Sequence, residues 1–275
     1  MKRLALCLAL AALPASAEGE RVLSIGGSVT EIVYALGEDH RLVARDTTSV
    51  WPPAALALPD VGYMRALAPE GVLSVAPDLI IAEDGSGPPE TLDVLRAAQV
   101  EYVTVPDGFD RPAVRAKIEA VADALGVPER GARLADRVDA ELAAAAEIET
   151  PGPKRVLFIL STQDGRITAA GTDTAADGII TLAGAENALT GFEGYKPVSA
   201  EAIGAAAPDV ILMMDRREGH AVSDADLFAM PAIAATPAAQ GENVVRIDGL
   251  LLLGFGPRTP EAVTRLNAAL YGERS

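Results

Sequence analysis

The sequence predicts an α/β protein made of two similar doubly wound lobes with mostly parallel sheets, joined by one long helix, with a cleft between the lobes. One phrase occurs twice, at residues 70–80 and 201–211, where a short apolar helix leads through Pro-Asp into an apolar β run. Pro cannot continue a helix and Asp favours a turn, so each copy marks a helix-to-strand step. Gly-Tyr precedes both copies, and each half opens with Arg-Val-Leu, at residues 21 and 155.

The expected strands alternate with helices along the whole chain. Apolar runs predict strands in the first half at 21–25, 42–44, 79–82 and 102–105. In the second half they predict strands at 155–160, 210–213 and 244–247, and a last helix that follows Gly256-Pro257 and ends near Tyr271. This alternation is typical of mostly parallel sheets.

A single helix is expected to join the two halves. Between residues 128 and 149, Leu134, Val138 and Leu142 recur at helical spacing among charged residues. A helix of this length has about six turns and spans roughly 30 Å, so it would limit how far the lobes swing.

From these patterns together, we expect a signal peptide at 1–17, an N-terminal lobe at 18–127, the connecting helix at 128–150 and a C-terminal lobe at 151–275.

The first 17 residues have the pattern of a secretory signal peptide. Lys2-Arg3 precede an apolar core at residues 4–13, and Ala15-Ser16-Ala17 forms a small-residue cleavage site. The apolar stretch is too short to span a bilayer. Cys7, the only cysteine, would be removed with this segment, and a lipoprotein would need it at the end of the apolar core instead. We expect an exported protein without disulfides.

Composition excludes several classes of function. The 39 acidic residues outnumber the 23 basic ones, and the net charge of −16 argues against nucleic acid and anionic membrane surfaces as partners. The two histidines, His40 and His220, are too few for the usual ligand sets of a zinc or manganese carrier. The sequence contains no nucleophile elbow, no metalloprotease helix and no triad pattern, so we expect a binding protein and not an enzyme.

Two glycine-containing loops are expected to cap helices. Ser28-Val29-Thr30-Glu31 reads as a capping box after Gly26-Gly27 and predicts a helix that starts there. Such a helix end either holds an anion or is simply capped. The glycine spacing excludes a dinucleotide fingerprint. In the second half of the chain, residues 171–177 are expected to cap a helix at 178–183 in the same way.

One further loop carries the sharper signal for a ligand. Tyr63 follows Gly62 at a strand-to-helix edge, and Arg65 lies two residues on. Arg216 and Arg217 follow an apolar strand of the second half, and ligands bind at the carboxyl ends of strands in open α/β sheets. Alternatively, Tyr63 only packs against neighbouring side chains, and the arginines are ordinary solvated surface charges. Together, a phenol and several guanidinium groups facing a cleft describe a site for a ligand with a hard metal centre and carboxylates.

Three segments resemble the haem-binding periplasmic proteins of bacterial ABC importers: residues 61–74, 194–201 and 248–259. The resemblance covers nearly the whole mature chain. It implies a class III periplasmic binding protein, with two lobes, a single connecting helix and haem b held between the lobes as the transported ligand. It also implies a periplasmic monomer that delivers haem to an ABC permease and ATPase complex of the inner membrane.

The resemblance assigns roles to individual residues. Tyr63 matches the family's axial tyrosine, Arg65 the arginine beside it, and Arg216 a cleft arginine that could bind a haem propionate together with Arg217. Some members add a histidine in the segment corresponding to residues 161–164, and this chain has none there. Phenols ordinarily have a pKa of about 10, so a phenolate ligand needs help from Fe(III) and a nearby cation. We expect one ferric haem.

Glu70 and Glu201 begin the two copies of the repeated phrase. In related proteins of this fold, a glutamate from each lobe meets arginines of a two-fold symmetric permease, which suits a duplicated carboxylate. Alternatively, both glutamates only complement a helix dipole. A carrier for a ferric siderophore or cobalamin would keep the fold and these glutamates, but would not need the Tyr-Met-Arg loop.

Overall fold

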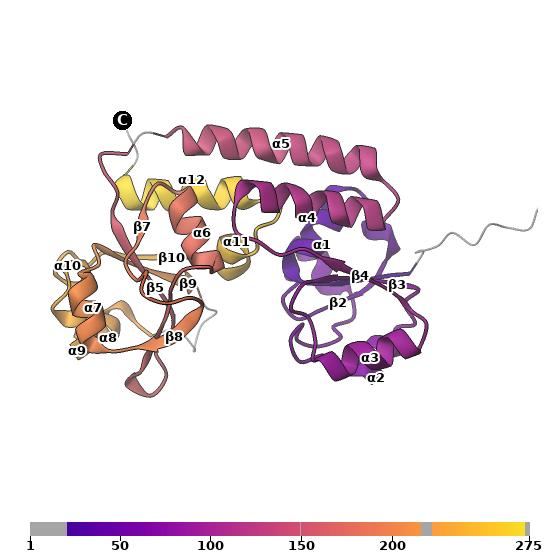
Figure 1. The fold of residues 1–275 in the computed structure, drawn as a ribbon, viewed down its shortest axis with the longest axis horizontal. Helices are drawn as coiled ribbons and strands as arrows, with labels where there is room; N and C mark the ends of the chain where they lie inside the picture. The colour runs from indigo at the N-terminus through magenta and orange to yellow at the C-terminus, as the bar shows by residue number, and fades with distance from the viewer. Residues whose placement is uncertain (1–20, 149, 216–221, 273–275) are drawn as a thin grey trace, which may run out of the picture.

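The computed structural model describes residues 21–148, 150–215 and 222–272, and it consists of two sheets with their helices side by side (Figure 1). We call the first sheet and its helices lobe one and the second sheet and its helices lobe two. The segment expected to be a signal peptide, at 1–17, lies outside the described residues. The exact limits of the lobes stay a prediction.

Lobe one is an all-parallel four-stranded sheet in the order β2-β1-β3-β4. Its strands are β1 (Val22–Ile25), β2 (Leu42–Arg45), β3 (Leu79–Glu83) and β4 (Glu101–Val105). Its helices are α1 (Gly27–Ala35), η1 (Asp39–Arg41), η2 (Pro53–Ala57), α2 (Pro69–Ser74), α3 (Pro89–Ala97) and α4 (Arg111–Ala124). β1 and β3 are buried on both faces, which explains their continuous apolar runs.

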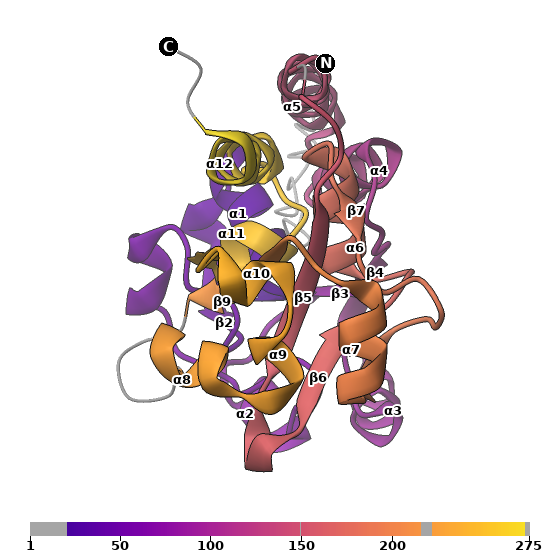
Figure 2. The same ribbon diagram turned by 90° about the vertical axis from the view of Figure 1, so that its left-hand side faces the viewer.

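Lobe two has a six-stranded mixed sheet, with β10-β9-β5-β6-β8 in order and β7 paired with β5. Its strands are β5 (Arg155–Ser161), β6 (Ile167–Ala170), β7 (Glu186–Asn187), β8 (Tyr195–Val198), β9 (Val210–Asp215) and β10 (Val244–Asp248). The helical elements are η3 (Gln163–Gly165), α6 (Ala175–Leu182), α7 (Ala200–Ala206), α8 (Asp224–Ala229), α9 (Pro231–Ala234), α10 (Pro237–Gln240), α11 (Gly249–Leu253) and α12 (Thr259–Tyr271). Figure 2 shows α7 to α10 on the outer side of this lobe.

The predicted fold class is confirmed, and lobe two adds an antiparallel portion that the sequence reading omitted. β6 pairs antiparallel with both β5 and β8, whereas β5, β7, β9 and β10 pair in parallel. β6 and β8 have four residues each, and β8 contains Pro197, which cannot donate to a ladder. Such short segments give little periodic signal.

The predicted connecting helix is α5 (Pro128–Ala146), which extends above both lobes in Figure 1. Its buried stripe includes Leu134, Val138 and Leu142, at the expected spacing. This stripe belongs to one apolar cluster that also contains β1 and α4 residues of lobe one and β5 and α12 residues of lobe two. Because both lobes share this cluster, moving one relative to the other would expose apolar surface to water.

Close contacts at two glycines and one ring pair also hold the lobes together. A Cβ on Gly178 in α6 would lie 2.3 Å from the carbonyl oxygen of Phe109 in lobe one, so only glycine fits there. The Phe109 ring meets Phe255 of lobe two edge-on, with centroids 5.4 Å apart. A Cβ on Gly27 of α1 would lie 2.4 Å from a methyl group of the Leu250 side chain in lobe two. The interface therefore has little room for sliding.

An ion pair crosses the junction near the start of α12. The Arg258 guanidinium donates to Glu31 of α1 through Nε, at 3.1 Å, and through Nη2. Burial raises the pKa of Glu31 above its ordinary value, although the hydrogen bonds and charge of Arg258 oppose the shift. Arg258 also lies 4.4 Å from the centroid of the Trp51 ring. One lobe-two side chain thus contacts two separate segments of lobe one.

The expected capping box at Ser28 is wrong. α1 begins at Gly27 with Gly26 as its N-cap and has no side-chain cap. Ser28 lies inside the first turn, and its hydroxyl instead donates to Glu83 at 2.8 Å. In lobe two, Thr174 caps α6 by accepting from the Asp177 amide, so this capping prediction is confirmed, with the helix starting at Ala175 and not at 178.

Candidate functional site

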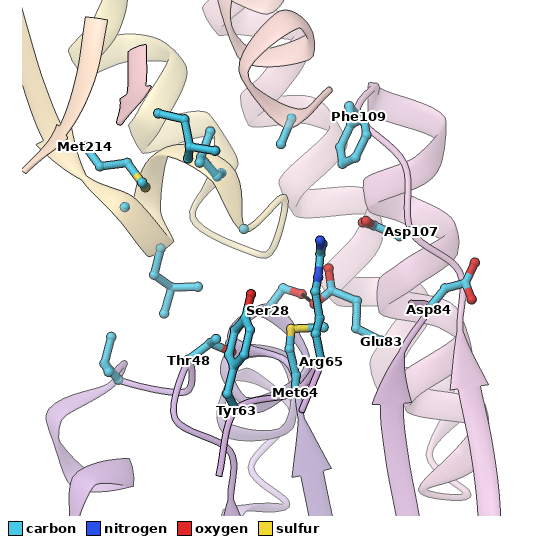
Figure 3. A pocket seen from close by; sticks show the side chains of 18 of the residues that line it. Ser28, Thr48, Tyr63, Met64, Arg65, Glu83, Asp84, Asp107, Phe109 and Met214 are labelled. Carbon is cyan, nitrogen blue, oxygen red and sulfur yellow. Dashed lines mark hydrogen bonds between the residues drawn. The ribbon is translucent and has the colours of Figure 1, made fainter. Parts of the chain in front are cut away.

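A cleft of about 530 Å³ lies between the two lobes, within the size range of small-molecule sites (Figure 3). Lobe one contributes the Tyr63 loop, the start of α1 and the ends of β3 and β4. Lobe two contributes an almost wholly apolar wall: Leu160, Ala175, Tyr195, Met214, Gly249, Leu250, Leu253 and Gly254. One wall therefore carries charge, and the other suits the face of an apolar ligand.

The loop before α2 directs Tyr63 and Arg65 into this cleft. Gly62 has a φ of 104°, a conformation that favours glycine, and its amide donates to Asp60 at 2.9 Å. Met64, only 8 % exposed, anchors the loop in the lobe-one core, so its two neighbours face outward. Tyr63 is 48 % exposed, and Figure 3 shows the Tyr63 and Arg65 side chains next to each other, pointing the same way.

Arg65 has no hydrogen bond or ion pair to another residue in the part of the chain that the structure describes. Its guanidinium group is therefore available to a ligand. Figure 3 shows it extending past Tyr63 toward the carboxylates of Glu83 and Asp107. A positive charge in this position can stabilise a phenolate on Tyr63 or an anionic group of a ligand.

A buried lysine controls the charge at the floor of the cleft. Lys117 of α4 is 0 % exposed, and its ammonium group donates to Asp107 at 2.9 Å and to Glu83 at 3.1 Å. It also lies 3.5 Å from the Ser28 hydroxyl and 3.4 Å from the carbonyl oxygen of Gly254. Since Gly254 belongs to lobe two, Lys117 links the two lobes at the cleft.

The two carboxylates around Lys117 are not equivalent. Burial raises the pKa of Glu83 above its ordinary value, although Lys117 opposes the shift, and the carboxylate of Asp107 raises it further. The single charge of the lysine thereby offsets one of the two negative charges that ionised Glu83 and Asp107 would present to the cleft. Without it, an anionic ligand would meet two carboxylates beside Arg65.

Tyr195 also lines the cleft, although no role was predicted for it from the sequence. It begins β8, follows Gly194 with a φ of 78°, and packs edge-on against Phe158 at 6.2 Å between centroids. The signal for it was present, because Gly-Tyr precedes both copies of the repeated phrase. Tyr63 precedes α2 and Tyr195 precedes α7, so the two lobes present tyrosines at corresponding places.

Four other candidate residues from the sequence are not seen in the cleft. Arg216, Arg217 and His220 lie outside the described residues. His40 is exposed within η1 and does not line the cleft. Among the described residues, no group of three or more His, Cys, Asp or Glu could hold a metal ion, and no helix is long and apolar enough to cross a membrane.

Glu70 and Glu201 lie in the first turns of α2 and α7, and both are exposed. Hydrogen bonds from the Glu201 backbone and from Ser199 lower the pKa of the Glu201 carboxyl, so this group stays ionised at neutral pH. Ser199 is the N-cap of α7. The two carboxylates thus occupy matching places in the two lobes, as the repeat predicted.

Two lobes that share an apolar core and enclose one cleft form the architecture of a bilobed binding protein. The family model for periplasmic binding proteins matches residues 22–250, and the chain belongs to this family. The family is one of binding proteins of the periplasm.

Solved structures narrow the comparison. The chain is 45 % identical to the periplasmic haem-binding protein BhuT, solved with two haems, over 91 % of this chain and 97 % of that one, with a TM-score of 0.86. It is 40 % identical to the periplasmic haem-binding protein RhuT from Roseiflexus sp. RS-1, over 92 % and 98 %, with a TM-score of 0.88. A vitamin B12-binding protein of Yersinia pestis is 28 % identical over 86 % of this chain and 84 % of its own length. The resemblance to haem-binding periplasmic proteins is confirmed.

Replacing Lys117 by Met should lower the free energy of unfolding by about 3 kcal/mol at pH 7, because it leaves two carboxylates without their buried counter-charge. The loss should shrink at pH 5, since burial raises the pKa of Glu83 and its protonation at lower pH removes part of the repulsion. Urea denaturation at both pH values measures this. Lys196→Met, at an exposed lysine, is the control. Equal losses in the two variants would contradict a role for Lys117 in stabilising the junction.

Proposed function

We propose that this protein captures one ferric haem in the cleft and delivers it to an ABC permease and ATPase complex of the inner membrane. The observation that carries the proposal is the loop that presents the Tyr63 phenol beside Arg65, whose guanidinium group pairs with no residue that the structure describes. In this function the protein is a monomeric carrier without enzymatic activity. The solved haem-binding relatives support haem as the ligand.

The cleft has the properties that a haem needs. A porphyrin ring is flat and apolar, and the lobe-two wall offers Leu160, Met214, Leu250 and Leu253 to one of its faces. On the other face, Tyr63 can supply a hard anionic oxygen, a ligand type that stabilises ferric iron. Removing water from a preformed apolar wall favours binding without a large rearrangement.

Arg65 and Lys117 have separate tasks in this proposal. Arg65 lowers the cost of ionising the Tyr63 phenol, and the Fe(III) charge adds to this effect. Lys117 holds the Glu83 and Asp107 carboxylates through its hydrogen bonds and thereby reduces the negative charge that competes with a ligand for Arg65. We assign the haem propionates to Arg216 and Arg217, because both follow β9, whose residue Met214 lines the cleft.

Vitamin B12 is the alternative ligand, favoured by the 28 % identical vitamin B12-binding relative. A ferric siderophore is the other alternative with this fold. Neither needs a phenol paired with a free guanidinium group on one loop. Haem is therefore the better fit to the cleft.

We assign Glu70 and Glu201 to docking on the permease. Both are exposed, and each begins a helix at the same place in its lobe. A two-fold symmetric partner can bind such a pair with the same basic surface on each half. Neither glutamate lines the cleft, so docking and ligand binding can be separated by mutation.

Replacing Tyr63 by Ala should abolish most of the haem affinity and the phenolate-to-iron charge-transfer band, because the only proposed iron ligand is lost. Hemin titration followed by visible absorption measures both. Tyr63→Phe keeps the ring and should show the same loss, whereas Tyr34→Phe, outside the cleft, should bind as the wild type does. A wild-type spectrum in the Tyr63→Ala variant would exclude this tyrosine as the ligand.

Replacing Arg65 by Ala should weaken hemin binding by about 1.5 to 3 kcal/mol, since a charged hydrogen-bond donor beside the phenolate is removed. Arg216→Ala should weaken it by a similar amount by leaving a propionate without its donor. Arg96→Ala is the matched control, because Arg96 is exposed, pairs with Asp93 and does not line the cleft. Unchanged hemin affinity in both cleft variants would make these arginines ordinary surface charges.

Replacing Glu70 and Glu201 together by Lys should leave the hemin titration unchanged and abolish haem-stimulated ATP hydrolysis by the reconstituted importer. The charge reversal repels the basic docking surface without touching the cleft. A double variant at Glu90 and Glu129 is the control, because these residues also lie in the first turns of helices. Normal stimulation by the Glu70 and Glu201 variant would reduce both glutamates to helix-dipole partners.

A further inference from the structure

The backbone of the Tyr63 loop is hydrogen-bonded on both sides of the turn. The Gly62 amide donates to Oδ1 of Asp60 at 2.9 Å, and the Gly62 carbonyl oxygen accepts from the Thr47 amide at 2.9 Å. The Tyr63 carbonyl oxygen accepts from the Ala66 amide at 2.8 Å. Since the Tyr63 side chain is half exposed, these backbone contacts decide where its phenol points.

The carboxylate of Asp60 joins this turn to a neighbouring segment. Its Oδ1 accepts from the Thr47 hydroxyl at 3.1 Å as well as from the Gly62 amide. Its Oδ2 accepts from Nη1 of Arg45 at 3.1 Å, and the backbones of Arg45 and Asp60 also form a parallel bridge. Asp60 does not line the cleft, so its contacts with the protein explain it better than a contact with a ligand.

Arg45 is a rigid partner for Asp60. It ends β2 and is only 8 % exposed. Its Nε donates to the carbonyl oxygen of Ala55 at 3.1 Å, and its Nη1 donates to that of Asp46 at 3.0 Å. A guanidinium group held in this way fixes the Asp60 carboxylate by a charged hydrogen bond. The Tyr63 turn is thereby attached to the lobe-one sheet.

We propose that Asp60 is a positioning residue for the iron ligand: its Oδ1 holds the Gly62 turn so that the Tyr63 phenol faces the iron, and Arg45 holds Asp60. This inference rests on the proposed haem-binding function. Residues that orient a metal ligand through hydrogen bonds commonly set the affinity for the metal. Here the orientation acts through the backbone before the ligand. A turn that is already ordered also spares the ligand the cost of ordering it.

The experiment compares Asp60→Ala and Asp60→Asn with wild type. Asp78→Ala is the control, because Oδ1 of Asp78 also accepts from a backbone amide of lobe one, that of Arg21 at 3.0 Å, and Asp78 does not line the cleft. Hemin titration gives the affinity, and resonance Raman spectra give the iron–phenolate stretch. Amide hydrogen exchange at Gly62, followed by NMR without hemin, reports on the turn itself. Urea denaturation checks that each variant is folded.

Asp60→Ala should lose about tenfold in hemin affinity, shift the iron–phenolate stretch and speed amide exchange at Gly62. Asp60→Asn keeps an oxygen that accepts from the Gly62 amide, so it should stay close to wild type in all three measurements. The proposal is overturned if Asp60→Ala keeps the wild-type affinity and stretch, if Asp60→Asn loses as much as Asp60→Ala, or if the Asp78→Ala control loses as much hemin affinity.

The exchange measurement separates this proposal from the proposed function, because it needs no ligand. Unchanged exchange at Gly62 in Asp60→Ala would overturn the positioning role even if hemin binds to the wild-type protein. Failure of the wild-type protein to bind hemin would instead refute the proposed function.

Discussion

The ammonium group of Lys117 is the charge on which the cleft depends. It is fully buried, yet it contacts the carboxylates of Glu83 and Asp107 in lobe one and the Gly254 carbonyl group in lobe two. A buried charge of this kind is tolerated only with close partners, so the lysine requires both lobes to stay in place. It also offsets the carboxylates next to the ligand. The same interaction that joins the lobes therefore leaves Arg65 as the cation that a ligand meets.

Rigidity follows from the way the lobes are joined. α5 packs its apolar stripe into a cluster shared by both lobes. Gly178 allows its backbone to touch the Phe109 carbonyl group of lobe one, and Gly27 leaves room for the Leu250 side chain of lobe two. A large hinge motion would separate these contacts and expose apolar surface. The cleft is consequently preformed, and ligand affinity is not spent on ordering it.

Much of the fold could be predicted because the repeated phrase and the apolar runs of the parallel strands are strong local patterns. The Tyr63 loop was found because Gly62 and the nearby arginine stand out in sequence. Lys117 was missed although it lies on the apolar stripe of α4, with Val114, Ile118 and Val121, because its partners come from distant segments. Tyr195 was missed although Gly-Tyr precedes both copies of the repeated phrase, because no arginine follows it as Arg65 follows Tyr63. The Ser28 capping box was wrong because the Ser28 hydroxyl binds Glu83, 55 residues away, and no local motif reports that contact.

The central claim is that a phenol from one lobe and an apolar wall from the other form a site for ferric haem. Parallel titrations of the purified protein with hemin and with cyanocobalamin, together with resonance Raman spectra of the loaded protein, test it most directly. We expect hemin to saturate at one equivalent, to give a five-coordinate high-spin spectrum with an iron–phenolate stretch, and cyanocobalamin not to bind. Binding of cyanocobalamin in place of hemin, or a haem complex without the phenolate signature, would contradict the claim.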